Sequence, residues 1–213
     1  MIPKLHYITQ GSSVEEHLEN IQKACNAGAE LVQLQLKGIS ERKILKFAFE
    51  AREITSHFQT RLIINGYYEI AKEVKADGVH LGKTDASPPM VRKHLYTWQL
   101  IGGTANTLQD SEILIENEVD YISLGPFRVT ETKDNLSPAL SLNGYTAIIE
   151  ALKTKTPILA VGGITTDDVT AILETGISGI AVSGAITRDF NSLKVFNELL
   201  KASSTEEQRY SFE

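Results

Sequence analysis

The sequence predicts an α/β protein, a TIM (β/α)8 barrel formed by a single domain over residues 1–202. Three observations favour this fold: short apolar runs recur along the chain, a helical pattern follows each of them, and no change in composition marks a linker. Alternating strands and helices require a parallel sheet, and eight repeats close such a sheet into a barrel. An open doubly wound sheet is the alternative, but it usually has fewer strands and a glycine-rich first turn, which this chain lacks.

The expected strands are short apolar runs, most of them rich in β-branched residues, as is typical of buried parallel strands. The fifth begins at residues 100–101 and runs into the segment Gly102-Gly103-Thr104. In chain order the strands cover residues 5–9, 31–36, 62–64, 78–81, 100–101, 121–124, 158–161 and 180–182.

Helices are expected between the strands, wherever apolar residues recur at helical spacing. Most begin at a serine, threonine or aspartate, and Pro88 with Pro89 opens one, since proline is tolerated in the first helical turn. Residues 127–142 form a long polar loop, and residues 203–213 are expected to be a frayed polar tail. The expected helices cover residues 14–27, 40–58, 68–74, 88 onward, 107–116, 144–152, 166–175 and 189–200.

Composition excludes several classes of protein. The 213 residues carry a net charge of −6, which argues against a nucleic-acid partner because such proteins usually present a basic face. Cys25 is the only cysteine, so no intrachain disulfide can form and a reducing compartment is indicated. No signal-peptide layout and no membrane-spanning apolar run are present. We therefore expect a cytoplasmic protein without a membrane partner; its oligomeric state is left open, a homo-oligomer included.

Two neighbouring strands near the end of the chain both run into glycine-containing loops. Gly162 and Gly163 follow the strand at 158–161, and Ser183 with Gly184 follows the strand at 180–182. Glycine lets backbone N–H groups approach a phosphate closely, and the loops after strands seven and eight of a barrel commonly bind phosphate. The alternative is that the glycines only make tight turns.

Polar residues alternate along the second expected strand. Gln33, Gln35 and Lys37 share one face, because side chains in a strand alternate between faces. In a barrel that face can point inward, and a lysine at the mouth is a natural partner for a diphosphate. An exposed strand face is the alternative.

Two ionisable residues lie at the end of the fourth expected strand. Asp85 is a candidate Mg²⁺ ligand, since Mg²⁺ is often held by one or two carboxylates together with substrate phosphates. It is equally a candidate for the N-cap of the helix at Pro88. His80 is either a general base or a buried core residue with satisfied hydrogen bonds.

The long loop carries Thr130, Thr132 and Lys133, hydroxyls and an ammonium that suit an oxyanion; an ordinary polar loop is the alternative. The strand ends together offer two candidate phosphate sites and no nucleophile with an adjacent base. This combination predicts an enzyme that joins two phosphorylated small molecules.

Several of these segments also occur together, in this order, in one enzyme family. Residues 4–200 resemble thiamine-phosphate synthase. The motifs that carry the resemblance are Gln33-Leu-Gln-Leu-Lys37, Asn65, Gly78-Val-His-Leu-Gly-Lys-Thr-Asp85, Gly125-Pro126, Thr130-Glu-Thr-Lys-Asp134 and Ala160-Val-Gly-Gly-Ile164.

The resemblance implies a transferase of thiamine biosynthesis on a (β/α)8 barrel. Such an enzyme couples hydroxymethylpyrimidine diphosphate to thiazole phosphate with Mg²⁺, and pyrophosphate leaves before the thiazole nitrogen attacks. It also implies residue roles, with Lys37, Thr104 and Lys133 as the catalytic residues and Asp85 as the metal ligand. The residues expected to bind the two substrates are Gln33, Gln35, Lys37, Asn65, Thr104, Thr130, Thr132, Lys133, Gly163, Val182 and Ser183.

The chain departs from the family pattern at three positions. Gln35 stands where the family usually has arginine, Gly66 where it usually has a second metal-binding aspartate, and Thr104 where it usually has serine. Lys83 or Arg128 is a candidate to replace the missing guanidinium, and a water to replace the missing carboxylate oxygen.

Two alternatives follow from these departures. One is a paralogue of reduced activity that binds thiazole phosphate or thiamine phosphate. The other is a barrel like the related thiazole tautomerases, which is disfavoured because those proteins use a histidine where this chain has Asn106.

Overall fold

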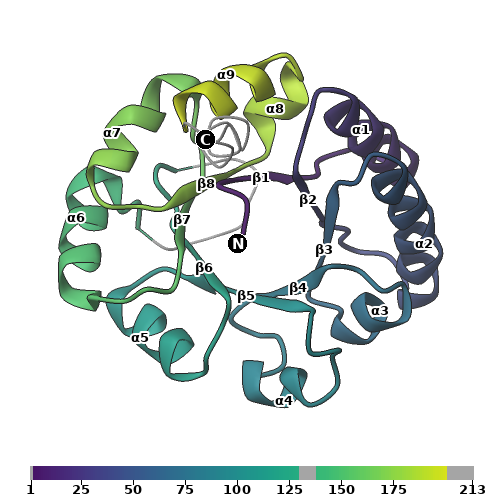
Figure 1. Ribbon diagram of the computed structural model, residues 1–213, viewed down its shortest axis with the longest axis horizontal. Helices are drawn as coiled ribbons and strands as arrows, with labels where there is room; N and C mark the ends of the chain where they lie inside the picture. The colour runs from purple at the N-terminus through teal and green to yellow at the C-terminus, as the bar shows by residue number, and fades with distance from the viewer. Residues whose placement is uncertain (1, 130–137, 201–213) are drawn as a thin grey trace, which may run out of the picture.

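The protein is a closed barrel of eight parallel strands surrounded by helices, as the sequence predicted (Figure 1). The computed structural model describes residues 2–129 and 138–200. Neighbouring strands in the chain are neighbours in the barrel, and β1 pairs with β8 to close it. The boundary of the domain at residue 202 stays a prediction, and the expected tail 203–213 lies outside the described residues.

The strands are β1 (Leu5–Ile8), β2 (Leu31–Leu34), β3 (Arg61–Asn65), β4 (Gly78–Leu81), β5 (Leu100–Ala105), β6 (Tyr121–Leu124), β7 (Ile158–Val161) and β8 (Gly179–Val182). The helices are α1 (Val14–Asn26), α2 (Glu41–His57), α3 (Tyr68–Glu73), α4 (Pro88–Arg92), α5 (Leu108–Glu116), α6 (Ser141–Leu152), α7 (Val169–Glu174), α8 (Gly184–Arg188) and α9 (Ser192–Leu199), with a 3₁₀ turn, η1 (Thr166–Asp168), before α7.

Three of the differences from the sequence-based expectation concern β2, α6 and α8. Strand β2 ends at Leu34 rather than at residue 36, because the next backbone N–H, that of Gln35, donates to the Thr9 hydroxyl at 3.1 Å. Helix α6 begins at Ser141, so the polar loop is shorter than expected. A five-residue helix, α8, follows β8 and was not predicted; it is too short to show a helical period.

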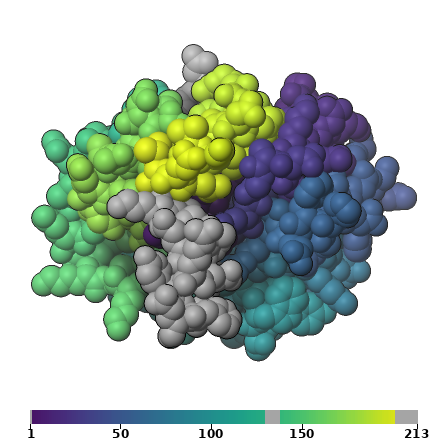
Figure 2. All heavy atoms as spheres, turned by 45° about the horizontal axis from the view of Figure 1, so that its top comes forward, coloured from purple at the N-terminus to yellow at the C-terminus, as the bar shows by residue number. Residues whose placement is uncertain are grey.

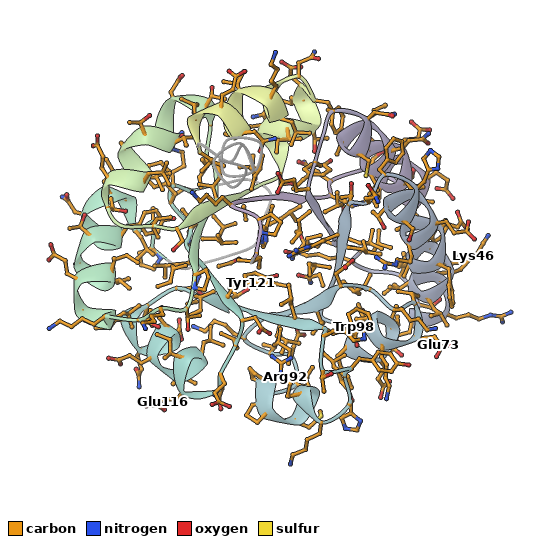
Figure 3. The ribbon with its side chains drawn as sticks, viewed as in Figure 1. Lys46, Glu73, Arg92, Trp98, Glu116 and Tyr121 are labelled. Carbon is orange, nitrogen blue, oxygen red and sulfur yellow. The ribbon has the colours of Figure 1, made fainter. Side chains whose placement is uncertain are left out.

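The interior of the barrel is filled by an aromatic side chain that a glycine accommodates. A Cβ atom on Gly102 would lie 2.0 Å from Cζ of Tyr121, so only glycine leaves room for this ring. Tyr121 is fully buried and lies inside the ring of strands, whereas Lys46 and Glu116 lie on the outer helices (Figure 3). Cys25 is buried in α1.

The helix that follows β8 lies beside the first helix of the chain. In Figures 1 and 2, α8 lies next to α1 on one side of the barrel, and in Figure 1 α9 lies between α8 and α7. The closing strand pair thus brings loops from both ends of the chain to one part of the barrel mouth. None of the described helices is both long enough and apolar enough to cross a membrane.

Candidate active site

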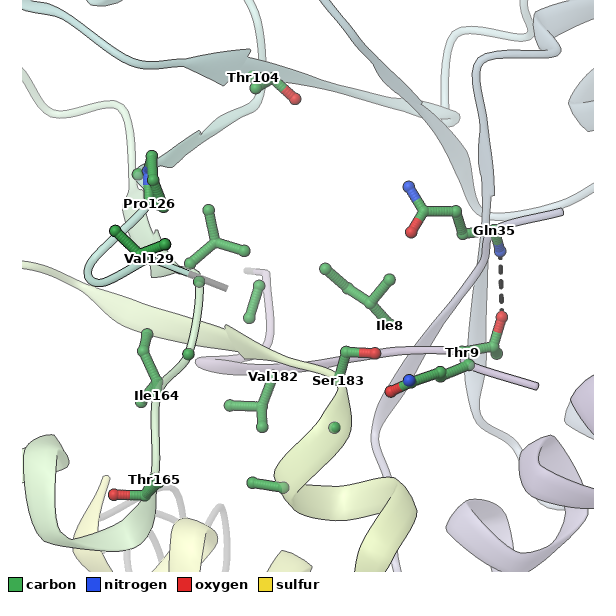
Figure 4. A pocket seen from close by; sticks show the side chains of 18 of the residues that line it. Ile8, Thr9, Gln35, Thr104, Pro126, Val129, Ile164, Thr165, Val182 and Ser183 are labelled. Atoms are coloured by element: carbon green, nitrogen blue, oxygen red, sulfur yellow. Dashed lines mark hydrogen bonds between the residues drawn. The ribbon is translucent and has the colours of Figure 1, made fainter. Parts of the chain in front are cut away.

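A cavity of about 520 Å³ lies at the carboxyl ends of the strands. It is where the loops of a barrel enzyme build an active site. Thr104 lies across it from Ser183, and Gln35 lies across it from Pro126 (Figure 4). The described residues that line it are Ile8, Thr9, Gln10, Gln35, Thr104, Asn106, Gly125, Pro126, Val129, Val161, Gly162, Gly163, Ile164, Thr165, Ala181, Val182, Ser183, Gly184, Ala185 and Arg188.

The glycine loop after β7 forms one wall of this cavity. Gly162 and Gly163 have φ values of +106° and +70°, a region that side chains other than glycine rarely adopt. A Cβ on Gly162 would also lie 2.7 Å from the Cβ of Pro126. The loop therefore makes a tight turn and also lines the cavity, and its binding of a phosphate stays a prediction.

The opposite wall contains Thr104, whose hydroxyl is tied to the barrel interior. His80 Nε2 lies 2.8 Å from Thr104 Oγ1, and His80 Nδ1 lies 3.1 Å from the Tyr121 hydroxyl. His80 is 4% exposed, so it is a buried core residue with satisfied hydrogen bonds, the second of the two roles considered for it. It contacts the cavity through Thr104.

The three polar residues expected on one face of the second strand, Gln33, Gln35 and Lys37, lie in three different environments. Gln33 is buried and donates through Nε2 to Oδ1 of Asn65 at 2.9 Å, so it does not belong to an exposed strand face. Gln35 lines the cavity. Lys37 lies beyond the end of β2, is exposed and is not among the residues lining the cavity.

Asp85 lies in the loop after β4 and is exposed. Its Oδ2 accepts the backbone N–H of Gly82 at 2.7 Å. The N-cap of α4 is Ser87, so the alternative role of Asp85 as the cap of that helix is wrong. Across the described chain no cluster of three or more His, Cys, Asp or Glu side chains is arranged to hold a metal ion.

Gly66 lies next to Asp85. A Cβ on Gly66 would be 3.3 Å from Asp85 Oδ2, so an aspartate here would place a second carboxylate beside the first. The chain therefore offers a single carboxylate at the point where the related family usually has two. This donor set fits Mg²⁺ only if substrate phosphate oxygens and water complete the coordination.

The two cations considered as replacements for the missing arginine are both engaged by carboxylates. Lys83 Nζ lies 2.8 Å from Asp110 Oδ2, and Arg128 pairs with Asp168 and stacks on the Phe127 ring. Burial alone would raise the pKa of Asp168, but hydrogen bonds from the Thr165 N–H and hydroxyl and from Arg128 lower it. The pKa of Asp110 is also lowered, against its burial, by Lys83, by the backbone N–H of Asn106 and by the side chain of Thr107.

The cavity thus brings together five of the residues predicted to bind substrate: Gln35, Thr104, Gly163, Val182 and Ser183. Gln33 and Asn65 are hydrogen-bonded to each other, whereas Lys37 and Asp85 are exposed in the loops after β2 and β4. Thr130, Thr132 and Lys133 lie outside the described residues.

Sequence reasoning missed Thr9, Gln10 and Arg188, which also line the cavity. The first two follow β1, whose pairing with β8 brings them to the site. Arg188 ends the unpredicted helix α8. Asn106, noted earlier only by comparison, donates through Nδ2 to the Gly125 carbonyl and fixes the loop after β6.

The fold is a closed parallel barrel, with glycine-containing loops after β7 and β8 and a cavity lined by polar residues at its mouth. These features are typical of TIM-barrel enzymes that bind phosphorylated ligands. A model of the thiamine monophosphate synthase family matches residues 5–186. The chain belongs to this family. The sequence-based prediction of a thiamine-phosphate synthase, and therefore of a transferase, is confirmed by its relatives.

Two relatives named thiamine-phosphate synthase illustrate the similarity. The protein of Flavobacterium johnsoniae is 41% identical over 190 residues, which cover 88% of this chain and 90% of that protein. The protein of Flavobacterium psychrophilum is 41% identical over 204 residues, with 94% and 99% covered. A solved structure of thiamine phosphate pyrophosphorylase from Pyrococcus furiosus superposes with a TM-score of 0.80 at 26% identity and covers 96% of each chain.

Proposed function

We propose that this chain couples hydroxymethylpyrimidine diphosphate with thiazole phosphate, giving thiamine phosphate and pyrophosphate. The observation that carries the proposal is one cavity whose lining includes both Gln35 with Thr104 and Gly163 with Ser183. Such a cavity can hold two small substrates against each other, which lowers the entropic cost of joining them. The names of the relatives give the product, thiamine phosphate, and the resemblance of the sequence to that family implies the two substrates.

The reaction proposed is dissociative. The bond between the pyrimidine methylene carbon and the diphosphate oxygen breaks with both electrons going to oxygen. The thiazole nitrogen then gives its lone pair to the carbocation. The side chains that line the described cavity include no cysteine, histidine, lysine or carboxylate, so this wall supplies hydrogen bonds rather than a covalent nucleophile.

Within this proposal Thr104 and Gln35 position the pyrimidine substrate, and Lys37 and Lys133 neutralise its diphosphate. Gln33 acts through Asn65, because the 2.9 Å hydrogen bond between them fixes the Asn65 amide. Gly163, Val182 and Ser183 surround the phosphate of the thiazole, together with Thr130 and Thr132. Backbone N–H groups at these glycines can approach a phosphate without hindrance from side chains.

Mg²⁺ is proposed as the cofactor, with Asp85 as its protein ligand. When bound, the ion would stabilise the negative charge that develops on the departing diphosphate. Asp85 is exposed, and its Oδ2 accepts the Gly82 N–H. Among the described hydrogen bonds none involves Oδ1, which can therefore face a metal ion. A cytoplasmic location is proposed with the function, consistent with the buried free thiol of Cys25.

Pyrophosphate release tests the function directly. The purified chain is incubated with Mg²⁺ and both substrates, and reactions lacking one substrate or Mg²⁺ serve as controls. Release that requires all three components supports the proposal. Release no faster than in the incomplete reactions rejects synthase activity.

The single carboxylate beside Gly66 and the two paired cations favour one second candidate, a paralogue that binds thiazole phosphate or thiamine phosphate with little turnover. Titration calorimetry with each ligand alone would identify it by binding without pyrophosphate release. The tautomerase alternative is disfavoured further, because Asn106 is committed to the Gly125 carbonyl.

A further inference from the structure

Arg188 is the charged side chain of the cavity wall. Among the described residues that line the cavity it is the only one with a formal charge, and none of them is acidic. The chain as a whole carries a net charge of −6, so an anion site needs positive charge placed locally. Within the described wall of the cavity, this guanidinium is therefore the group that can supply the positive charge.

The guanidinium has no carboxylate partner within the described part of the chain. The neighbouring carboxylate, that of Asp189, is turned to another group, since its Oδ1 accepts the backbone N–H of Asn191 at 3.0 Å and the side-chain amide of Asn191 at 3.1 Å. Arg188 differs in this from Lys83 and Arg128, which are both paired with acids. Its hydrogen-bond donors remain available to a ligand.

The position of the guanidinium is set by Gly184. A Cβ placed on Gly184 would lie 3.1 Å from Arg188 Nη1 and 3.4 Å from Gln10 Oε1. Arg188 therefore folds back over the first turn of α8, next to Ser183 and to the loop that follows β1. This is the part of the mouth formed by the β1–β8 junction, where α8 adjoins α1 (Figures 1 and 2).

We infer that Arg188 binds the phosphate monoester of the thiazole substrate and selects for its phosphorylated form. The inference rests on the proposed function, because that function supplies the substrate. The loops after strands seven and eight commonly hold a phosphate in this fold, and Arg188 lies at the end of α8, the short helix that follows β8. A guanidinium can donate two parallel hydrogen bonds to a phosphate.

Binding of three ligands to three variants tests the inference by titration calorimetry. The ligands are thiazole phosphate, the corresponding thiazole alcohol, and hydroxymethylpyrimidine diphosphate. The variants are Arg188→Gln, which removes the charge, Arg188→Lys, which keeps it without the planar fork, and the control Lys194→Gln. Lys194 is an exposed cation on α9 that does not line the cavity.

Arg188→Gln is expected to weaken binding of thiazole phosphate by roughly tenfold to a hundredfold, the usual effect of losing a charge-assisted hydrogen bond. Binding of the alcohol should change by less than about twofold, so the preference for the phosphorylated form collapses. Arg188→Lys should fall between wild type and Arg188→Gln, and Lys194→Gln should bind like wild type. In turnover, the KM for thiazole phosphate should rise and the KM for the diphosphate should stay constant.

An unchanged ratio of phosphate to alcohol affinity in Arg188→Gln would overturn the inference. Weaker binding of the diphosphate alone would also overturn it, and would assign Arg188 to the other substrate. A wild-type chain that binds thiazole phosphate through Arg188 without releasing pyrophosphate would reject the proposed synthase function and leave this inference standing. A wild-type chain that binds no thiazole phosphate would reject both.

Discussion

His80 Nε2 lies 2.8 Å from Oγ1 of Thr104, so a buried imidazole stands directly behind a hydroxyl that lines the cavity. The other ring nitrogen of His80 is 3.1 Å from the Tyr121 hydroxyl, whose ring is accommodated by Gly102. The position of the Thr104 hydroxyl is therefore fixed from the centre of the barrel. If Tyr121 donates to Nδ1, Nε2 carries the proton and donates to Thr104, which then donates its own proton to a ligand.

Thr104→Val should lower kcat by roughly tenfold or more, because the hydroxyl is lost and Nε2 of His80 is left without this partner. Thr104→Ser keeps the hydroxyl and should stay within about threefold of wild type. Steady-state pyrophosphate release measures both. Equal rates for Thr104→Val and wild type would show that the Thr104 hydroxyl takes no part in substrate binding or catalysis.

Gly66→Asp should destabilise the protein without Mg²⁺ and regain stability when Mg²⁺ is added. The backbone at Gly66 has a φ of +78°, and the new Cβ would lie 3.3 Å from Asp85 Oδ2. The strained backbone costs about 1–2 kcal/mol, and repulsion between the two carboxylates adds to it. Thermal unfolding with and without Mg²⁺ measures the effect.

Gly66→Asn is the matched control, since it carries the same backbone strain without the charge. Its melting temperature should not respond to Mg²⁺. If it responds as much as Gly66→Asp, the second carboxylate is not the cause. Combined with Gln35→Arg, Gly66→Asp should also raise turnover, and an unchanged or lower rate would contradict the assigned importance of these two departures from the family.

Gly162→Ala should destabilise the fold more than Gly28→Ala. Both glycines have positive φ, +106° and +88° respectively, but nothing lies within 4 Å of a Cβ on Gly28, whereas one on Gly162 would lie 2.7 Å from Pro126 Cβ. We expect about 1 kcal/mol for Gly28→Ala and roughly 2–3 kcal/mol more for Gly162→Ala. Urea unfolding gives both values, and equal losses would show that the loop after β6 yields easily.

His6 should make the fold sensitive to mild acid. Burial lowers the pKa of His6 from 6.5 to about 3, so the folded protein keeps this ring neutral. The unfolded chain binds a proton below about pH 6.5, and stability is therefore lost as the pH falls from that value toward 3, by up to about 1.4 kcal/mol per pH unit. Above pH 6.5 this group contributes no pH dependence.

His6→Leu should flatten that part of the profile. Urea midpoints at pH 7, 5 and 4 should fall less steeply for the variant than for wild type, whatever the difference at pH 7. Parallel profiles would mean that other groups cause the acid sensitivity. The comparison of slopes separates protonation from the packing change next to Tyr121, whose ring lies edge-on to His6 at 5.0 Å.

The barrel could be predicted because most strands are short apolar runs and a helical pattern follows each of them. Such patterns depend only on residues that are close together in the sequence. The end of β2 could not be predicted, because it depends on a hydrogen bond between Gln35, which follows β2, and Thr9, which follows β1. Likewise, the role of His80 as a buried residue could not be decided from the sequence, because its hydrogen-bond partners Thr104 and Tyr121 belong to two other strands.

The candidate site was predicted at its strand ends and missed where helices contribute. Ser183 and Gly163 carry recognisable motifs, and both line the cavity. Arg188 carries none, since α8 has only five residues and no period. Its place at the cavity follows from the way it folds over Gly184, a contact that no spacing rule contains.

The seam between β1 and β8 has a consequence for synthesis on the ribosome. Leu5 pairs with Ile180, so the first strand to emerge lacks its second neighbour until nearly all of the barrel has been translated. Gln10, which follows β1, and Ser183, which follows β8, both line the cavity. A nascent chain that stops short of β8 carries every motif of the first seven strands and still has no complete pocket, so ligand capture would report that translation has passed the final strand.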